Sequence, residues 1–270
     1  MSEEQNTALI SRREGAVLVL SNNNPAARNA LSPAFYRALT QALQDAKNDA
    51  SVGAIVLTGE GGHFCAGGDL RQLVKRRELS LPERREKLEG LHDLIRAVRD
   101  CPKPVIAAVE GAAAGAGLSL ALACDMLVAA RNAAFSVAYV KIGLTPDGGA
   151  TAFLAEFVSR QVLTELCLTG ERISGERMHA LGPVNRLAEP GQALAQALAL
   201  ATQLAAGPDE AMAHIKQLCR DAYGNTLEQQ LEQEARFMVH AQASEESREG
   251  MAAFLEKRPA DFTQLRQPRT

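Results

Sequence analysis

The chain has 270 residues, of which 46% are hydrophobic and 23% charged, as is usual for a globular protein with a large core. Its formal net charge of -3 gives no electrostatic reason to expect a nucleic acid or an anionic membrane as partner. No apolar run approaches the roughly 20 residues of a membrane helix, and the acidic N-terminus lacks a signal-like apolar core. The five cysteines are scattered and form no CxxC pair. We therefore expect a cytoplasmic protein with reduced thiols.

The first half of the chain alternates segments typical of strands and helices. Apolar runs that predict strands occupy residues 16–20, 54–58, 105–109, 126–130 and 134–137. Ser32 and Pro33 predict a helix to about Lys47, because serine caps helices and proline is favoured at their first position. A further helix is expected to end near Arg99. This alternation predicts an α/β protein.

Residues 71–87 carry many charges of both signs, which indicates a solvated helix or a mobile surface loop. From about Ala150 onward the pattern is almost entirely helical, interrupted by glycine and proline. A short apolar piece at 184–187 is the candidate for a last edge strand. The second half is therefore expected to form a helical subdomain.

Two expected strands run into glycine-rich loops. Residues 110–125, EGAAAGAGLSLALACD, follow the run at 105–109, and residues 59–68 follow the run at 54–58. Each loop could supply one backbone N–H to the same negatively charged oxygen, as in an oxyanion hole. The alternative for the first loop is close packing of a helix on the sheet. The histidines lack metal-ligand spacing, so no metal site is expected.

Three motifs resemble the crotonase superfamily, the enoyl-CoA hydratase/isomerase group. They are HFCAGGDL at 63–70, PKPVIAAVEGAAAGAGLSLALACD at 102–125 and FSVAYVKIGLTPDGGA at 135–150. The resemblance runs from about residue 8 to the FLEKR segment at 254–258. It implies a crotonase-like spiral of ββα units at 1–200 and a helical C-terminal segment at 201–270. That segment would mediate a homotrimer or a dimer of trimers and cap coenzyme A.

The resemblance also implies an acyl-coenzyme A thioester substrate, with no cofactor besides the coenzyme A of that substrate. The oxyanion-hole N–H groups would belong to Gly68 and Ala116. The positions that match the coenzyme A channel of the family are Arg28, Ala30, Leu31, Ala66, Asp69, Leu70, Phe254 and Lys257. The last two would reach the nucleotide end, often from a neighbouring subunit.

The chain departs from the hydratase pattern at both catalytic glutamates. Alignment places Ser119 and Tyr139 at those positions, and neither is a good base at neutral pH. Asp147, in the Pro-Asp-Gly-Gly loop, is the remaining candidate acid–base residue, and some ring-remodelling members of the family use an aspartate in such a loop. Its alternative role is a turn or helix cap. Tyr139 is expected either to donate a hydrogen bond or to line an aryl-binding pocket.

These features predict an acyl-CoA isomerase or related enzyme that works through a thioester enolate. The motifs most resemble those of family members linked to phenylacetyl-CoA degradation. The alternatives are a hydratase with unusual water activation and a non-catalytic protein that binds CoA esters.

Overall fold

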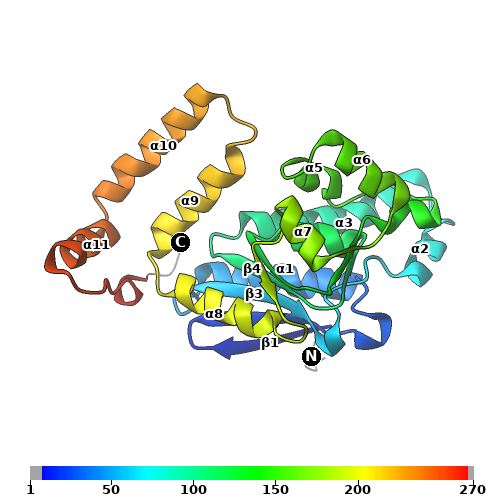
Figure 1. Cartoon of the computed structure of the whole chain (residues 1–270), viewed down its shortest axis with the longest axis horizontal. Coiled ribbons are helices and arrows are strands. Elements are labelled where there is room, and N and C mark those ends of the chain that lie inside the picture. The colour runs from blue at the N-terminus through cyan, green and yellow to red at the C-terminus, as the bar shows by residue number, and fades with distance from the viewer. Residues whose placement is uncertain (1–7, 267–270) are drawn as a thin grey trace.

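A computed structural model describes residues 8–266 of the protein, which form two sheets surrounded by helices (Figure 1). The larger sheet has the order β1-β2-β3-β4-β6-β9, in which only β1 and β2 pair antiparallel. Its strands are Leu9–Glu14, Val17–Asn22, Ala54–Gly59, Val105–Val109, Met126–Ala130 and Arg186–Ala188. The smaller sheet, β5-β7-β8, consists of Ala112–Ala114, Ala134–Ser136 and Ile173–Ser174.

The five predicted strands are present, and the predicted edge strand is β9 at the margin of the larger sheet. Sequence reasoning missed β1, β5 and β8. β1 is a half-exposed edge strand with three charged residues, β5 is made of alanine alone, and β8 has two residues. None of these carries the β-branched apolar run that marks a buried strand.

Helices cover both faces of the larger sheet, so its central strands are buried on both sides. Alternate residues of β2 point to opposite faces: Leu18 and Leu20 belong to one core cluster, and Val17 and Val19 to another. The first cluster is closed by α1 (Pro33–Asn48), α3 (Leu81–Asp100) and α4 (Ala116–Leu122), and the second by α8 (Ala193–Ala205). The predicted cap of α1 is confirmed, because Ser32 Oγ accepts from Phe35 N at 3.2 Å.

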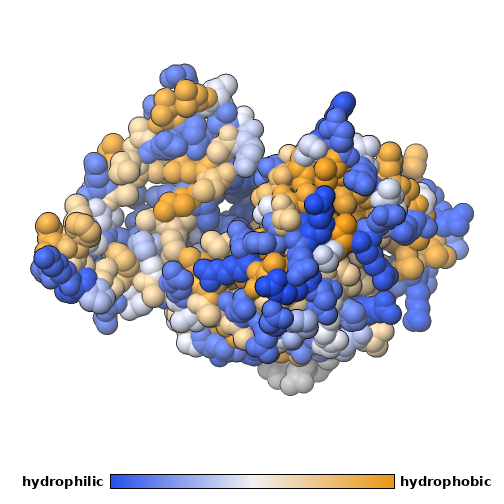
Figure 2. Space-filling view, viewed as in Figure 1, coloured by the Kyte–Doolittle hydropathy of each residue, from blue (hydrophilic) through white to orange (hydrophobic). Residues whose placement is uncertain are grey.

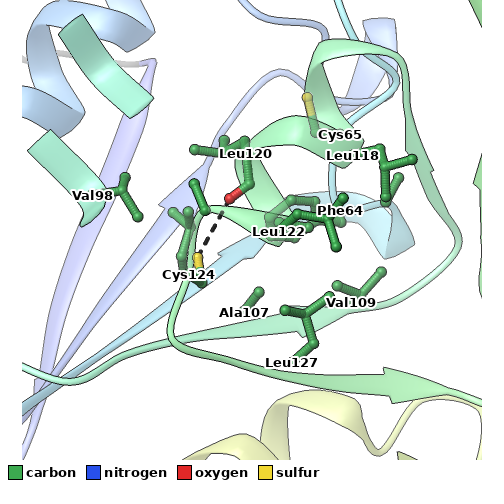
Figure 3. Close-up of a cluster of buried hydrophobic side chains, with 14 of the residues drawn as sticks. Phe64, Cys65, Val98, Ala107, Val109, Leu118, Leu120, Leu122, Cys124 and Leu127 are labelled. Carbon is green, nitrogen blue, oxygen red and sulfur yellow. Dashed lines mark hydrogen bonds between the residues drawn. The ribbon is translucent and has the colours of Figure 1, made fainter. Parts of the chain in front are cut away.

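Helix α4 lies at the centre of the molecule, and all seven of its residues are buried. Figure 3 shows Leu118, Leu120 and Leu122 of this helix in one cluster with Phe64 and with Ala107 and Val109 of strand β4. Apart from Ser119 the helix is apolar on every side, which is typical of a helix that the fold encloses. Its N-terminus is therefore held rigidly inside the protein.

The charged segment 71–87 is divided between two helices. Helix α2 spans Leu70–Arg76, and α3 begins after Ser80 with a capping box in which Ser80 and Glu83 satisfy each other's backbone N–H groups. The shorter helices α5 (Ala150–Ala155), α6 (Arg160–Thr169) and α7 (Gly175–Leu181) follow the smaller sheet strands. Within residues 8–266, four 3-10 segments complete the list of elements: 25–27, 60–62, 138–142 and 263–265.

The last three helices project from the layered core as an arm (Figure 1). They are α9 (Asp209–Asp221), α10 (Leu227–Gln242) and α11 (Glu245–Glu256). Figure 2 shows apolar side chains on the outside of this arm. The exposed apolar residues of α10 and α11 include Met238, Val239, Phe254 and Leu255. The predicted segments 1–200 and 201–270 include residues 1–7 and 267–270, which lie outside the described residues. None of the helices within residues 8–266 is long and apolar enough to cross a bilayer.

Candidate active site

The two glycine-rich loops lie against each other and share backbone hydrogen bonds. Cys65 N donates to Ala112 O at 2.9 Å, and Ala114 N donates to Cys65 O at 3.0 Å. Phe64 N donates to Glu110 O at 2.9 Å. This short parallel pairing fixes the register of one loop relative to the other, which the sequence could not show.

Gly67 brings the two proposed oxyanion-hole residues together. It has a φ of +96°, and a Cβ atom built on it would lie 2.7 Å from Ala114 O and 3.5 Å from Ala116 N. Gly68 is the next residue, and Ala116 is the first residue of α4, where backbone N–H groups have no partner within the helix. Neither Gly68 N nor Ala116 N donates to a backbone hydrogen bond within residues 8–266. An oxyanion hole requires two such donors aimed at one oxygen, and Gly68 N and Ala116 N are the candidates for them.

Asp147 is held by Ser119 and Tyr139, the two residues expected from the sequence at the positions of the family's glutamates. Tyr139 Oη donates to Asp147 Oδ1 at 2.7 Å, and Ser119 Oγ donates to the Asp147 carbonyl oxygen at 2.9 Å. The Tyr139 ring also lies 3.8 Å from the Cβ position of Gly115, the residue before Ala116. The Asp147 carboxylate is thus hydrogen-bonded to a ring that borders Gly115, next to the proposed oxyanion-hole residue Ala116.

Of the two alternative roles of Asp147, the turn is present, because Ala150 N donates to Asp147 O at 3.3 Å, whereas the helix cap is not. The N-cap of α5 is Gly149, with φ +85°, and the Asp147 carboxylate bonds to Tyr139 instead of a helix N–H. Of the two roles expected for Tyr139, the structure therefore has the hydrogen-bond donor.

Burial raises the pKa of Asp147, an effect that the Tyr139 hydrogen bond and the charges of His92 and Arg76 oppose without cancelling it. Burial and the neighbouring Asp147 charge also raise the pKa of Tyr139. The Tyr139 phenol therefore stays protonated at neutral pH and remains a donor. A carboxylate of raised pKa in a half-buried site suits proton transfer better than one exposed to water.

The Arg28–Leu31 segment packs on the same loop. Ala66 N donates to Arg28 O at 2.9 Å, and Leu31 N donates to Gly67 O at 2.7 Å. The fully buried Asn29 fixes this contact, because its side-chain amide donates to Glu60 O at 2.8 Å and His63 O at 2.6 Å. Sequence reasoning did not assign Asn29 this role.

The remaining predicted coenzyme A positions differ in exposure and in their place in the fold. Ala30 is buried behind the loop, whereas Asp69 caps α2 by accepting from Arg71 N at 2.9 Å, and Leu70 is exposed. Phe254 and Lys257 are exposed at the end of the arm, on the opposite side of the molecule from α2 (Figure 1). A single chain does not bring these last two residues to the others.

Four further residues surround the site and were missed in the sequence. Leu73 on α2 lies 3.5 Å from the Cβ position of Gly68. The charges of Arg76 on α2 and His92 on α3 lower the pKa of Asp147, and the charge of Asp147 raises the pKa of Tyr36 on α1. They lie in segments that read as ordinary amphipathic or charged helices. Only the half-burial of Leu73 and Arg76 within exposed α2 distinguishes them, and that property is tertiary.

Comparison with known proteins agrees with this geometry. Residues 12–266 match the family model described as enoyl-CoA hydratase/isomerase. The chain belongs to the enoyl-CoA hydratase/isomerase family. The predicted membership of the crotonase group is therefore confirmed, and with it the expectation of an enzyme of this family.

Individual members of the family resemble the chain along nearly its whole length. It is 36% identical to 1,2-epoxyphenylacetyl-CoA isomerase of Escherichia coli K12, over 94% of this chain and 98% of that protein. It is 35% identical to 2,3-dehydroadipyl-CoA hydratase of the same organism, with the same coverage. The crystal structure of an enoyl-CoA hydratase from Polaromonas sp. JS666 superposes with a TM-score of 0.92 at 48% identity, covering 94% of this chain and 98% of that one. The predicted crotonase-like α/β fold is confirmed.

Proposed function

We propose that this enzyme isomerises an acyl-CoA thioester through an enolate, with Asp147 as the acid–base residue. The observation that carries the proposal is the Asp147 carboxylate itself, half-buried, of raised pKa, and bonded to Tyr139 beside the oxyanion loop. Ser119 and Tyr139 replace the paired glutamates and orient Asp147. A single mobile proton then suits isomerisation better than addition of water.

In the proposed reaction Asp147 removes a proton from the carbon next to the thioester carbonyl, or from its vinylogous position. The electrons of that C–H bond move into an enolate whose oxygen accepts from Gly68 N and Ala116 N. Protonated Asp147 returns the proton to a different carbon, so the substrate gains and loses no atoms. Each aimed backbone donor contributes about 3–4 kcal/mol to stabilising such an oxyanion.

The similarity to 1,2-epoxyphenylacetyl-CoA isomerase favours an aromatic or ring-derived acyl group, as in phenylacetate degradation. The similarity to proteins described as hydratases keeps water addition as the second candidate. In that case Asp147 would activate the water.

We also propose that the arm assembles the chain into homotrimers or dimers of trimers in the cytoplasm. The exposed apolar residues of α9–α11 support assembly, because they would be buried by a neighbouring copy. Phe254 and Lys257 would then reach the nucleotide end of coenzyme A in an adjacent subunit.

The test of the proposed chemistry is deuterium uptake from D2O into crotonyl-, 3-enoyl- and phenylacetyl-CoA. The wild type should exchange or isomerise at least one of them, and Asp147→Asn should lose at least 100-fold of that rate. Asp93→Asn is the matched control, because Asp93 is exposed on α3 and pairs with Arg96. Its rate should equal that of the wild type.

Two outcomes would contradict the proposal. Addition of water that survives Asp147→Asn would favour a hydratase that uses other groups. Tight binding of the esters with no exchange by the wild type would favour a non-catalytic binding protein.

A further inference from the structure

The Gly67–Gly68 peptide carries one of the two proposed oxyanion donors, and a hydrogen bond from behind fixes its orientation. Leu31 N donates to Gly67 O at 2.7 Å. No peptide bond within residues 8–266 is cis, and a trans peptide directs its C=O and its N–H to opposite sides. The bond from Leu31 therefore aims Gly68 N–H away from Leu31. A peptide between two glycines meets little steric resistance to rotation, so this bond opposes it.

Asn29 holds Leu31 in that place. Its backbone is left-handed, with a φ of +58°, and its side chain is fully buried. The side-chain amide donates to Glu60 O at 2.8 Å and to His63 O at 2.6 Å, and its Oδ1 accepts from Asn24 N at 2.9 Å. Three hydrogen bonds thus fix the glycine-rich loop and the preceding turn to this one side chain.

The ring of His63 takes a place that a backbone carbonyl has elsewhere in the pairing of the two loops. Ala114 N donates to Cys65 O, as in a regular parallel ladder. Two residues earlier, the same pattern would have Ala112 N donate to His63 O. That carbonyl accepts from Asn29, and Ala112 N donates to His63 Nδ1 at 3.2 Å. His63 therefore joins three segments, two of them through its carbonyl and its ring.

The ring reaches Ala112 because Gly111 leaves room for it. A Cβ atom on Gly111 would lie 2.5 Å from His63 Nδ1, and Gly111 has a φ of +55°. A ring nitrogen that accepts a hydrogen bond carries no hydrogen, so the hydrogen of the neutral ring is on Nε2. The contact needs only an acceptor at the position of Nδ1.

We propose that Asn29 and His63 are positioning residues, which hold the Gly67–Gly68 peptide with its N–H directed into the oxyanion hole. His63 sets the loop of this peptide against the loop that carries Ala116, and Asn29 places Leu31 behind the peptide. Both act through backbone groups, so they affect the polarisation of the thioester carbonyl more than the affinity for the ester. This inference rests on the proposed oxyanion hole and is independent of which residue is the base.

The test is the infrared band of the thioester carbonyl in [1-13C]phenylacetyl-CoA bound to the full-length enzyme. Two aimed N–H groups weaken the C=O bond, so the wild type should lower the frequency of this band relative to the free ester. Asn29→Gly removes the amide and tolerates a positive φ, and His63→Phe keeps a ring without the acceptor. Both should return the band toward the free-ester frequency.

The same two variants should show a split between turnover and binding. The rate of deuterium exchange at saturating ester should fall about tenfold or more, because one aimed donor is displaced. The dissociation constant of the ester should change by less than about threefold, because the hole acts mainly on the transition state.

His63→Asn is the conservative variant, because asparagine Oδ1 lies as many bonds from Cα as histidine Nδ1 and accepts the same N–H. It should keep the lowered band and an exchange rate within about tenfold of the wild type. His179→Phe is the matched control, since His179 Nδ1 donates to Val184 O at 2.7 Å outside the site. It should change neither quantity. If Asn29→Gly does not fold, His63→Phe and His63→Asn make the comparison alone.

The inference is overturned if Asn29→Gly and His63→Phe keep the lowered band, or if they weaken binding as much as they slow exchange, as a structural role would. It is also overturned if His63→Asn behaves like His63→Phe, because the ring would then be needed for more than its acceptor. Asp147→Asn should keep the lowered band, which separates the hole from the base. A lowered band without exchange in the wild type counts against the proposed chemistry alone. A wild type that does not lower the band overturns the oxyanion hole and this inference with it.

Discussion

Asp147 is a carboxylate under two opposing influences. Burial favours its protonated form, while the Tyr139 hydrogen bond at 2.7 Å favours the ionised form. To act as a base it must be ionised, so the rate of proton abstraction should fall as the pH drops through its pKa. The position of that acidic limb measures the balance between the two influences.

Replacement of Tyr139 by phenylalanine should shift this limb. The change removes the donor that stabilises the carboxylate, so the pKa of Asp147 rises and the limb moves to higher pH by about one unit. The measurement is the pH dependence of kcat/KM for deuterium exchange. Tyr223→Phe, at an exposed tyrosine, is the control and should leave the profile in place. A limb that stays in place or moves to lower pH in Tyr139→Phe would show that the bond does not tune the base.

At the scale of the element, the loop at 63–68 acts as a short strand against β5. Its conformation depends on Gly67, whose φ of +96° is rarely adopted by residues with a side chain. The contact with Ala114 O leaves no space for a Cβ. Glycine is therefore required here by both backbone conformation and close approach.

Gly67→Ala should lower activity by about 100-fold or more, because displacing the loop moves one of two aimed donors. It should also lower the free energy of unfolding by about 1–3 kcal/mol. Gly62→Ala is the matched control, since Gly62 has φ +80° but nothing within 4 Å of its Cβ position. The control should lose some stability and keep its activity, as measured by urea unfolding and exchange assays. Equal loss of activity in both variants would contradict the role of the close approach.

At the scale of the whole molecule, one buried ion pair and one partly exposed ion pair attach the arm to the core. Lys103 Nζ lies 2.9 Å from Asp209 Oδ2, and the Lys103 side chain is 0% exposed. Lys216 Nζ lies 2.6 Å from Asp125 Oδ2 and donates to Cys101 O and Lys103 O, each at 2.7 Å. Asp209 is the first residue of α9, so these bonds secure the helix from which the rest of the arm extends.

Asp209→Asn should lower the free energy of unfolding by about 3–5 kcal/mol, because it leaves the Lys103 charge buried without a counter-charge. Glu210→Gln breaks the exposed contact with His240 and should cost less than about 1 kcal/mol.

Light scattering should give three or six times 28.8 kDa for the wild type and a lower mass for Asp209→Asn. A monomeric wild type would contradict the proposed assembly, and an unchanged stability would contradict the anchoring role.

The sequence alone determined the α/β class, the five main strands, the capped start of α1 and the two glycine-rich loops. These features depend on local causes, namely the continuous apolar runs of strands buried on both faces, the capping chemistry of serine and the backbone freedom of glycine. It also singled out Gly68, Ala116 and Asp147, through motifs that resemble the family.

Only the tertiary structure decided how these pieces meet. It paired the loops through Cys65, bonded Tyr139 to Asp147, and brought Leu73 of the charged helix α2 against Gly68. It also made β5 a strand, although alanine has little intrinsic preference for one. The physical reason is that such contacts join residues far apart in the chain, whose distance is set by packing of the whole core and not by any local pattern.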